Sequence, residues 1–310
     1  MRTRTRTLLG PCVTVVALVL VAACSGGTTG DTSSGRAESP GEASTVVSAS
    51  PVPSIMKLVP ASVAKSGALR VGVAVGSPPD EFQDEHGNLV GWEVDIVRTA
   101  AQVMGLSVTF SDAPFDSLIP GLAADRYDLA IGQFGVTGER EKVIDFVTTL
   151  TSNQLFAAKA DSTLTVDTLA DLCGHSVATS RGSREVEFAT QQSLQCVAAG
   201  KGPVGVQVFD DTNKAGLALM SGRADLFWLG STAINYFVST THDQAKVVGH
   251  YLDPNPIGTA LQKNSQLSEP LRAAMQHNIG SGTYAKVLDK WGITSGAIPT
   301  SQINPQVSPG

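Results

Sequence analysis

Several features that mark other classes of protein are missing from this 310-residue sequence. Beyond residue 21, no segment holds the eighteen or so apolar residues that a membrane-spanning helix needs. The five histidines are scattered, with no pair spaced to bind a metal, and there is no phosphate-binding loop. Basic side chains number 22 against 28 acidic ones, which argues against a nucleic-acid partner. We therefore expect neither a metal nor a cofactor.

The first 24 residues read as an export signal. Three arginines (Arg2, Arg4 and Arg6) precede an apolar stretch from Leu8 to Val21, and small residues lead to Cys24. Val21-Ala22-Ala23-Cys24 matches the bacterial lipobox, so residues 1–23 are expected to be removed and Cys24 to carry lipid. The alternative is an ordinary export signal with a chance cysteine. We expect an exported protein, anchored by lipid to the outer face of the cytoplasmic membrane.

The segments on either side of the folded region are poor in large apolar groups. Residues 24–60 are predicted to be a flexible tether, and 294–310 a disordered tail rich in Pro, Ser and Gln. Removal of residues 1–23 leaves 19 basic against 28 acidic side chains, which argues against a basic membrane-binding surface. The region between the two segments is long enough for one large domain or two lobes.

Of the four cysteines, only Cys173 and Cys196 stay unassigned, since Cys12 leaves with the signal and Cys24 takes lipid. An exported protein folds in an oxidising compartment, so we predict a disulfide between these two. Two buried free thiols are the alternative.

Predicted strands and helices alternate along the chain. Residues 69–75 form a strand, followed by a turn-rich loop through Phe82, and a helix, a strand, a helix and a buried strand (129–131) come next. A similar alternation continues from about 168 to 291. This order indicates a parallel sheet covered by helices on both faces, with the loops after the strands facing a ligand crevice.

Arg140 falls at an unusual place. Thr137 is a suitable N-cap, which puts Arg140 in the first turn of a helix. That turn already carries partial positive charge and unpaired N–H groups, so a cation there needs an anion nearby. The anion is either a ligand or a neighbouring acid such as Glu139, Glu141 or Asp145.

The ordered set of motifs resembles the bacterial extracellular solute-binding proteins of family 3, the polar amino-acid receptors of ABC importers. The resemblance covers residues 66–293 and is carried by Leu69-Arg70-Val71-Gly72-Val73, Gly87 to Ile96, Phe115 to Leu122, Tyr127 to Leu129, Glu139 to Phe146, Asp171 to Val177, Gly222 to Asp225 and Gly282 to Gly292.

The resemblance implies an α/β fold of the periplasmic-binding-protein type II, with mixed, mostly parallel sheets in two lobes joined by a two-strand hinge. Lobe one would comprise 62–156 and 258–293, and lobe two 157–257. The lobes would close over a small solute bearing a carboxylate, such as a polar or acidic amino acid, because only closure lets both lobes touch it. A membrane permease would be the partner, and the protein is expected to be a monomer.

The resemblance also implies ligand contacts. Arg140 would grip the ligand carboxylate with its planar guanidinium, and Gln133 and Gly135 would hold its amino and carboxylate ends. Phe115 would form an apolar wall or belong to the core. Ser183 would present a helix start to the carboxylate, and Arg184 would either add a second positive charge to the cleft or face solvent.

Three residues depart from the family pattern. Ser77 replaces an aromatic lid, and Ala74 replaces an acid that serves basic side chains, which disfavours lysine, arginine or ornithine. Gly230 stands where an aspartate usually pairs with the ligand ammonium. Either Asp80 or Glu81 substitutes for that carboxylate, or the ligand lacks a free α-ammonium, because an unpaired buried ammonium is costly.

Two other functions compete with transport. Gly174 to Ala178 is a poor match to a nucleophile elbow. An enzyme on the same fold, similar to cyclohexadienyl dehydratases, would need one acid in the cleft, for which Asp80, Glu81 and Glu185 are candidates. A sensor component that presents ligand to a membrane receptor is the second alternative.

Overall fold

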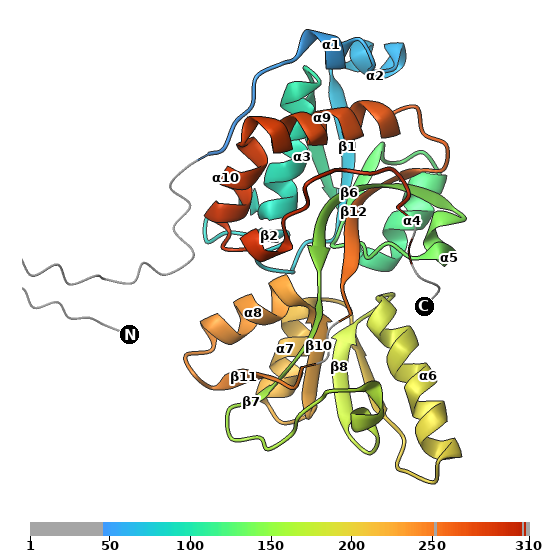
Figure 1. The fold of residues 1–310 in the computed structure, drawn as a ribbon, viewed down its shortest axis with the longest axis vertical. Coiled ribbons are helices and arrows are strands. Elements are labelled where there is room, and N and C mark those ends of the chain that lie inside the picture. Colours follow the sequence, from blue (N-terminus) through green and yellow to red (C-terminus); the bar gives the residue numbers. More distant parts are fainter. Residues whose placement is uncertain (1–45, 251–252, 306, 308–310) are drawn as a thin grey trace, which may run out of the picture. The chain divides into compact units, whose positions relative to one another are not determined.

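Residues 46–250, 253–305 and 307 are described by the computed structural model, so the export signal, Cys24 and the first part of the tether lie outside it. Two five-stranded sheets organise these residues (Figure 1). The first has the order β4-β1-β5-β12-β6, formed by β1 (Ala68–Val73), β4 (Ser107–Asp112), β5 (Leu129–Ile131), β6 (Ile144–Ser152) and β12 (Asn255–Gln262). The second has the order β11-β7-β10-β8-β9, formed by β7 (Gln154–Lys159), β8 (Ser176–Ser180), β9 (Gly205–Phe209), β10 (Leu226–Gly230) and β11 (Ala245–Val248).

Helices cover both faces of each sheet. Those associated with the first sheet are α3 (Trp92–Val103), α4 (Phe115–Ala123), α5 (Gly138–Glu141), α9 (Ser268–Ser281) and α10 (Thr283–Lys290). Those associated with the second are the 3₁₀ helix η1 (Leu169–Leu172), α6 (Arg184–Ala198), α7 (Thr212–Met220) and α8 (Ser231–Thr240). Outside the two sheets lie α1 (Pro53–Met56), α2 (Ala61–Ser66), the hairpin of β2 (Phe82–Gln83) and β3 (Leu89–Val90), and η2 (Thr294–Gly296). The predicted α/β fold is confirmed.

Both sheets are mixed. Strand pairing is parallel between β1 and its neighbours β4 and β5, and between β8 and its neighbours β9 and β10. It is antiparallel where β12 joins β5 and β6, and where β7 joins β10 and β11. Figure 1 shows β6 and β12 running side by side from one sheet toward the other. The chain thus passes between the sheets twice, once after β6 and once before β12.

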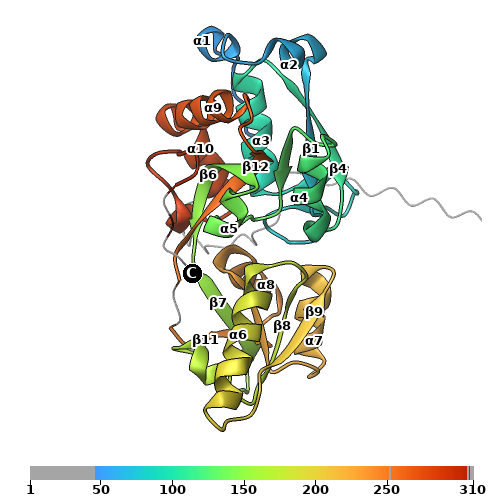
Figure 2. The ribbon, with the colours of Figure 1, turned by 90° about the vertical axis from the view of Figure 1, so that its right-hand side faces the viewer.

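The second sheet shows how strand periodicity builds two cores. Adjacent residues of a strand point to opposite faces, and Phe227 and Trp228 accordingly belong to different buried clusters. Trp228 packs on the side of α6, together with Ala189. Phe227 packs on the side of α7 and α8, where Leu219 and Ile234 are also buried. These helices lie on opposite faces of the sheet (Figure 2).

In the first sheet, one face is covered by α3, α9 and α10, and Trp92, Ile96 and Val97 of α3 are almost fully buried with strand residues. Burial of each such side chain stabilises the fold by roughly 1.5–3 kcal/mol. On the other face, Leu118 and Leu122 of α4 pack with Phe134 and Phe146. The packing of α4 fixes the loops that follow β4 and β5, where the site forms.

The structure differs from the sequence-based expectation at both ends of the folded region. Within the predicted tether, the backbone N–H of Val52 donates to the carbonyl of Val103 at 2.9 Å, and Ile55 is buried. Within the predicted disordered tail, Ser301 is buried and its hydroxyl donates to the carbonyl of Thr148 at 2.8 Å. A few apolar side chains are enough here, because they dock on a core that already exists.

A disulfide joins Cys173 and Cys196, as predicted, and ties the end of η1 to α6. None of the helices formed by the described residues is both long and apolar enough to span a bilayer. Nor do these residues bring together three His, Cys, Asp or Glu side chains in a way that suits a metal ion.

Candidate functional site

A cavity of about 600 Å³ lies between loops of the two sheets, a size typical of small-molecule sites. From the first sheet, its lining comes from the segments that follow β1, β4 and β5. From the second sheet, it comes from those that follow β8 and β9, and from the region of β10 and α8. Ligands of open α/β sheets bind at these carboxyl ends of strands, and the cavity obeys that rule.

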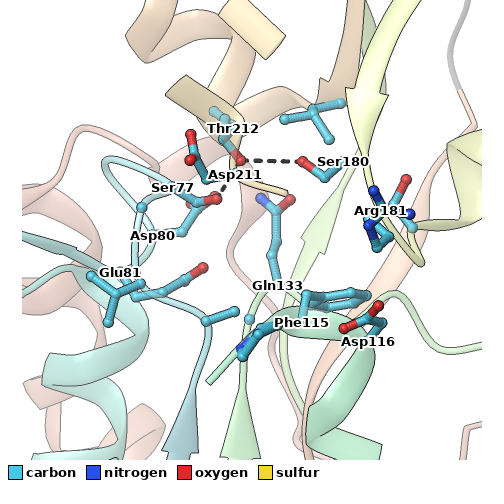
Figure 3. Close-up of a pocket in the computed structure, with 18 of the residues that line it drawn as sticks. Ser77, Asp80, Glu81, Phe115, Asp116, Gln133, Ser180, Arg181, Asp211 and Thr212 are labelled. Carbon is cyan, nitrogen blue, oxygen red and sulfur yellow. Dashed lines mark hydrogen bonds between the residues drawn. The ribbon is translucent and has the colours of Figure 1, made fainter. Parts of the chain in front are cut away.

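The cavity gathers nearly all of the predicted site residues. Its lining includes Ser77, Asp80, Phe115, Gln133, Gly135, Arg140, Ser183 and Arg184. Gly230 is buried and does not belong to the lining. Figure 3 shows Asp80 and Glu81 on one side, Phe115, Asp116 and Arg181 on the other, and Gln133 between them.

Arg140 is held by neutral groups. The predicted N-cap is present, since the hydroxyl of Thr137 accepts from the backbone N–H of Arg140 at 3.2 Å. The guanidinium donates to the carbonyl of Gly135 at 2.9 Å and, across the cavity, to the carbonyl of Gly182 at 3.2 Å. It also lies 5.6 Å from the ring centre of Phe115, a distance suited to a cation–π contact.

Within the described part of the chain, no carboxylate lies close enough to form an ion pair with Arg140. Of the neighbouring acids that were the alternative partners, Glu139 pairs with Lys142 at 2.6 Å and Asp145 with Lys263 at 3.0 Å, and Glu141 forms no ion pair with Arg140. Burial lowers the pKa of Arg140, while the more distant Glu185 and Glu187 act in the opposite direction. The guanidinium is therefore a cation that lines the cavity without an acid beside it.

Arg184 is buried at the first position of α6, with only 9% of its surface exposed, and does not face solvent. Its Nη2 pairs with Asp253, and its guanidinium carbon lies 4.8 Å from the ring centre of Phe188. The Nε and Nη1 atoms are buried without a hydrogen-bond partner. We call Arg140 and Arg184 the arginine wall of the cavity. Ser183 occupies the N-cap position next to it, with its hydroxyl 3.3 Å from that of Thr179.

The opposite side holds buried acids. Asp80 and Glu81, which we call the acidic wall, both line the cavity, and Glu93 lies behind them, also buried. Asp80 accepts from the indole N–H of Trp92 at 2.5 Å, and Glu93 accepts from the backbone N–H of Gln133 at 2.6 Å. One carboxylate oxygen of each of the three acids is buried without a partner.

Burial changes the protonation of these acids, because a low-dielectric surrounding disfavours the charged form. It raises the pKa of Asp80 to about 7, against the hydrogen bonds from Thr232 and Trp92, which lower it. It raises the pKa of Glu81 still more clearly, with help from the negative charges of Glu93 and Asp80. The charge of the acidic wall therefore depends on pH near neutrality.

Phe115 belongs both to the cavity lining and to the core. Its ring lines the cavity and also stacks on Phe134, with ring centres 4.7 Å apart. The stacking attaches the cavity wall to the core cluster on the α4 face. Phe115 is therefore a rigid apolar surface beside Arg140.

Side chains from the two sheets also meet directly across the cavity. The hydroxyls of Ser77 and Thr212 lie 2.5 Å apart, and the amide of Gln133 donates to the hydroxyl of Thr232. With the Arg140 contact to Gly182, these bonds join the loops of one sheet to the loops of the other. Ser77 thus acts in a polar contact between the sheets, at the place where an aromatic lid was the family expectation.

Sequence reasoning missed three residues that shape the site. Glu93 sits in the first turn of α3, where an acid is ordinary because it complements the helix dipole. Thr232 and Asp253 come from segments far along the chain, and only the fold brings them to Gln133 and Arg184. No local pattern in the sequence marks any of the three.

Comparison with known proteins gives consistent matches. A model of the bacterial extracellular solute-binding proteins, family 3, matches residues 69–294. Arginine-binding protein ArgT of Corynebacterium glutamicum is 32% identical over 257 residues, covering 83% of this chain and 84% of that protein. L-cystine-binding protein TcyJ of Escherichia coli is 29% identical over 231 residues, covering 74% and 84%. The solved structure of an ancestral arginine-binding protein bound to arginine has a TM-score of 0.65 at 32% identity, covering 73% of this chain and 98% of that one.

Proposed function

Because this chain belongs to the bacterial extracellular solute-binding proteins of family 3, we propose that it captures a polar α-amino acid for import by an ABC transporter. Arg140 holds the α-carboxylate, with Ser183 and the start of α6 beside it. The lobes, 62–156 with 258–293 and 157–257, close over the ligand, turning about the two connections between the sheets.

The observation that carries the proposal is the separation of charge within one cavity. Arg140 has no acid partner among the described residues, and Asp80 and Glu81 across the cavity have carboxylate oxygens without partners. An amino acid is a small molecule that satisfies both sides, with its carboxylate at the arginine wall and a positive group at the acidic wall. Each charge-assisted hydrogen bond contributes roughly 1.5–3 kcal/mol.

The acidic wall bears on which amino acid is bound. Ala74 lacks the acid that serves basic side chains in similar proteins, but Asp80 and Glu81 line the same cavity and can supply that charge. The relatives ArgT and the ancestral protein are named for arginine. We therefore take L-arginine as the first candidate, which reverses the expectation from Ala74 that a basic side chain is disfavoured.

Export and anchoring belong to the same proposal. The basic and apolar leader and the lipobox ending at Cys24 support secretion and lipid attachment at the outer face of the cytoplasmic membrane. A membrane permease would receive the ligand there.

The test is calorimetric titration of the purified protein with L-arginine, L-glutamine, L-cystine and L-glutamate, alongside mass spectrometry of small molecules released on unfolding. We expect binding of an amino acid that carries a positive side chain, and no binding of L-glutamate, because its second carboxylate would face the acidic wall. Absence of binding by every amino acid would refute the proposal. Incubation of the purified protein with prephenate or arogenate tests the dehydratase alternative. An enzyme of that kind would accumulate product, and a binding protein would not.

A further inference from the structure

Gln133 is fixed in an unusual backbone conformation. Its φ is +51°, in the left-handed region that a non-glycine residue seldom adopts. The backbone N–H donates to the buried carboxylate of Glu93 at 2.6 Å. This anchoring aims the side chain into the cavity between the loops of the two sheets (Figure 3).

Gly230 is the residue that makes room for this side chain. Its φ is −59°, which any amino acid adopts, so the backbone does not require glycine there. A methyl group added to Gly230 would lie 2.5 Å from Oε1 of Gln133 and 3.0 Å from its Cδ and Nε2. The contact with Oε1 is under 3 Å and forces a shift, and the group that moves is the amide end of the flexible Gln133 side chain. Positions 133 and 230 therefore share one space, and only one of them can fill it.

Thr232 sets the orientation of the Gln133 amide. Nε2 of Gln133 donates to the hydroxyl of Thr232, and that hydroxyl donates in turn to the carboxylate of Asp80. No described residue donates to Oε1 of Gln133, although Gln133 lines the cavity. The amide oxygen is thus an open acceptor, and the amide nitrogen links the acidic wall to the second sheet.

We propose that Gln133 determines ligand specificity by occupying the space of a side chain at 230, so that the ligand's amino end meets a neutral amide oxygen instead of a carboxylate. This inference rests on the proposed function. The charge that balances the ligand comes from Asp80, which Gln133 reaches through Thr232. The carboxylate that is absent at Gly230 is then replaced by that of Asp80, which comes from a loop of the first sheet.

A double-mutant cycle tests the shared space, with L-arginine as the probe. Gly230→Ala alone should weaken binding at least ~10-fold, because its methyl group displaces the Gln133 amide. Gln133→Ala alone should weaken binding about 5-fold through loss of the acceptor, close to 1 kcal/mol. In the Gln133→Ala background, Gly230→Ala should cost less than about 2-fold, since the space is then empty.

Gly280→Ala is the matched control. Gly280 lies in α9 away from the cavity, and a methyl group added there would meet nothing within 4 Å. It should leave affinity unchanged. Equal costs for Gly230→Ala in both backgrounds, or no cost in the parent protein, would overturn the inference while the proposed function stands.

Thermal unfolding of the same variants without ligand separates misfolding from lost recognition. Gly230→Ala should lower the melting temperature, and Gln133→Ala should recover most of that loss in the double variant. If Gly230→Ala fails to fold, recovery of folding and of L-arginine binding in the double variant supports the shared space, and failure to recover either refutes it. If the parent protein binds no amino acid, the proposed function and this inference both fall.

Discussion

The two walls of the cavity obtain their charge in different ways. The arginine wall is fixed, because a guanidinium stays protonated at every ordinary pH, and Arg140 is positioned by carbonyl oxygens. The acidic wall is adjustable, because burial raises the pKa of Asp80 to about 7 and that of Glu81 well above its usual range. The raised pKa values of Asp80, Glu81 and, behind them, Glu93 favour the neutral form of these acids. Under the proposed function, one wall would face the carboxylate of the ligand and the other its positive groups.

The arginine wall gives the largest expected effect. Arg140→Ala should weaken L-arginine binding about 100-fold, since two charge-assisted bonds to a carboxylate are worth roughly 3 kcal/mol together. Titration calorimetry measures the change. Arg181→Ala is the matched control, because Arg181 also lines the cavity but is exposed and pairs with Asp210 at 2.9 Å, and its loss should cost less than about 3-fold. Similar losses in both variants would show that general positive charge, and not the Arg140 geometry, binds the carboxylate.

The acidic wall should make the affinity for L-arginine depend on pH. Asp80 is ionised above its raised pKa of about 7 and neutral below it, and a positive group of the ligand at the acidic wall needs the ionised form. Affinity for L-arginine should therefore be highest at pH 8 and fall by about 10-fold at pH 6, since each pH unit below the pKa removes up to one factor of ten. Glu81 and Glu93 have raised pKa values too and would steepen the fall. Asp80→Asn should bind weakly at both pH values with a smaller dependence, and an unchanged pH profile in that variant would contradict the role of Asp80.

The smallest effect should come from the second arginine. Arg184 already pairs with Asp253, so a ligand carboxylate competes with that acid for the guanidinium. We expect Asp253→Asn to strengthen binding about 3-fold and Arg184→Ala to weaken it by a similar factor, in the range of partly exposed ion pairs. Arg272→Ala, which breaks a surface pair with Glu269, is the control and should change nothing in the same titration. Opposite signs for the two cavity variants would place Arg184 within the arginine wall in function as well as in geometry.

Much of the fold could be predicted because local patterns and packing agree. The strand at 129–131, the cap at Thr137 and the helix that begins after Ser183 are present where periodicity and capping place them. The position of Arg140 in the sequence left two kinds of partner open, a ligand or a neighbouring acid, and only the family resemblance favoured the ligand. Only the fold sends Glu139 and Asp145 to other cations and leaves the guanidinium in the cavity.

Other features of the site depend on partners far apart in the sequence. From the sequence, Gly230 was interpreted as the loss of a carboxylate. The residues around it in the sequence do not indicate that Gln133, from a loop of the first sheet, lies against it. Asp253 and Thr232 were overlooked for the same reason. At both ends of the folded region, composition predicted disorder where a few residues such as Ile55 and Ser301 dock on an existing core. The composition of a segment indicates whether it can form a core by itself. It does not indicate whether the segment can pack against a domain that is already folded.

The segment after η2 has a further consequence for the first sheet. β6 is the last strand in its sheet order, and Thr148 N–H donates to the carbonyl of Gln302 at 2.9 Å while Asn304 N–H donates to Phe146. These residues occupy hydrogen-bonding positions that would otherwise offer a second molecule a place to add a strand. A protein shortened to the matched family region, which stops at 294, would expose that edge and tend to self-associate. Gln302 and Asn304 thus cover part of the outer edge of β6.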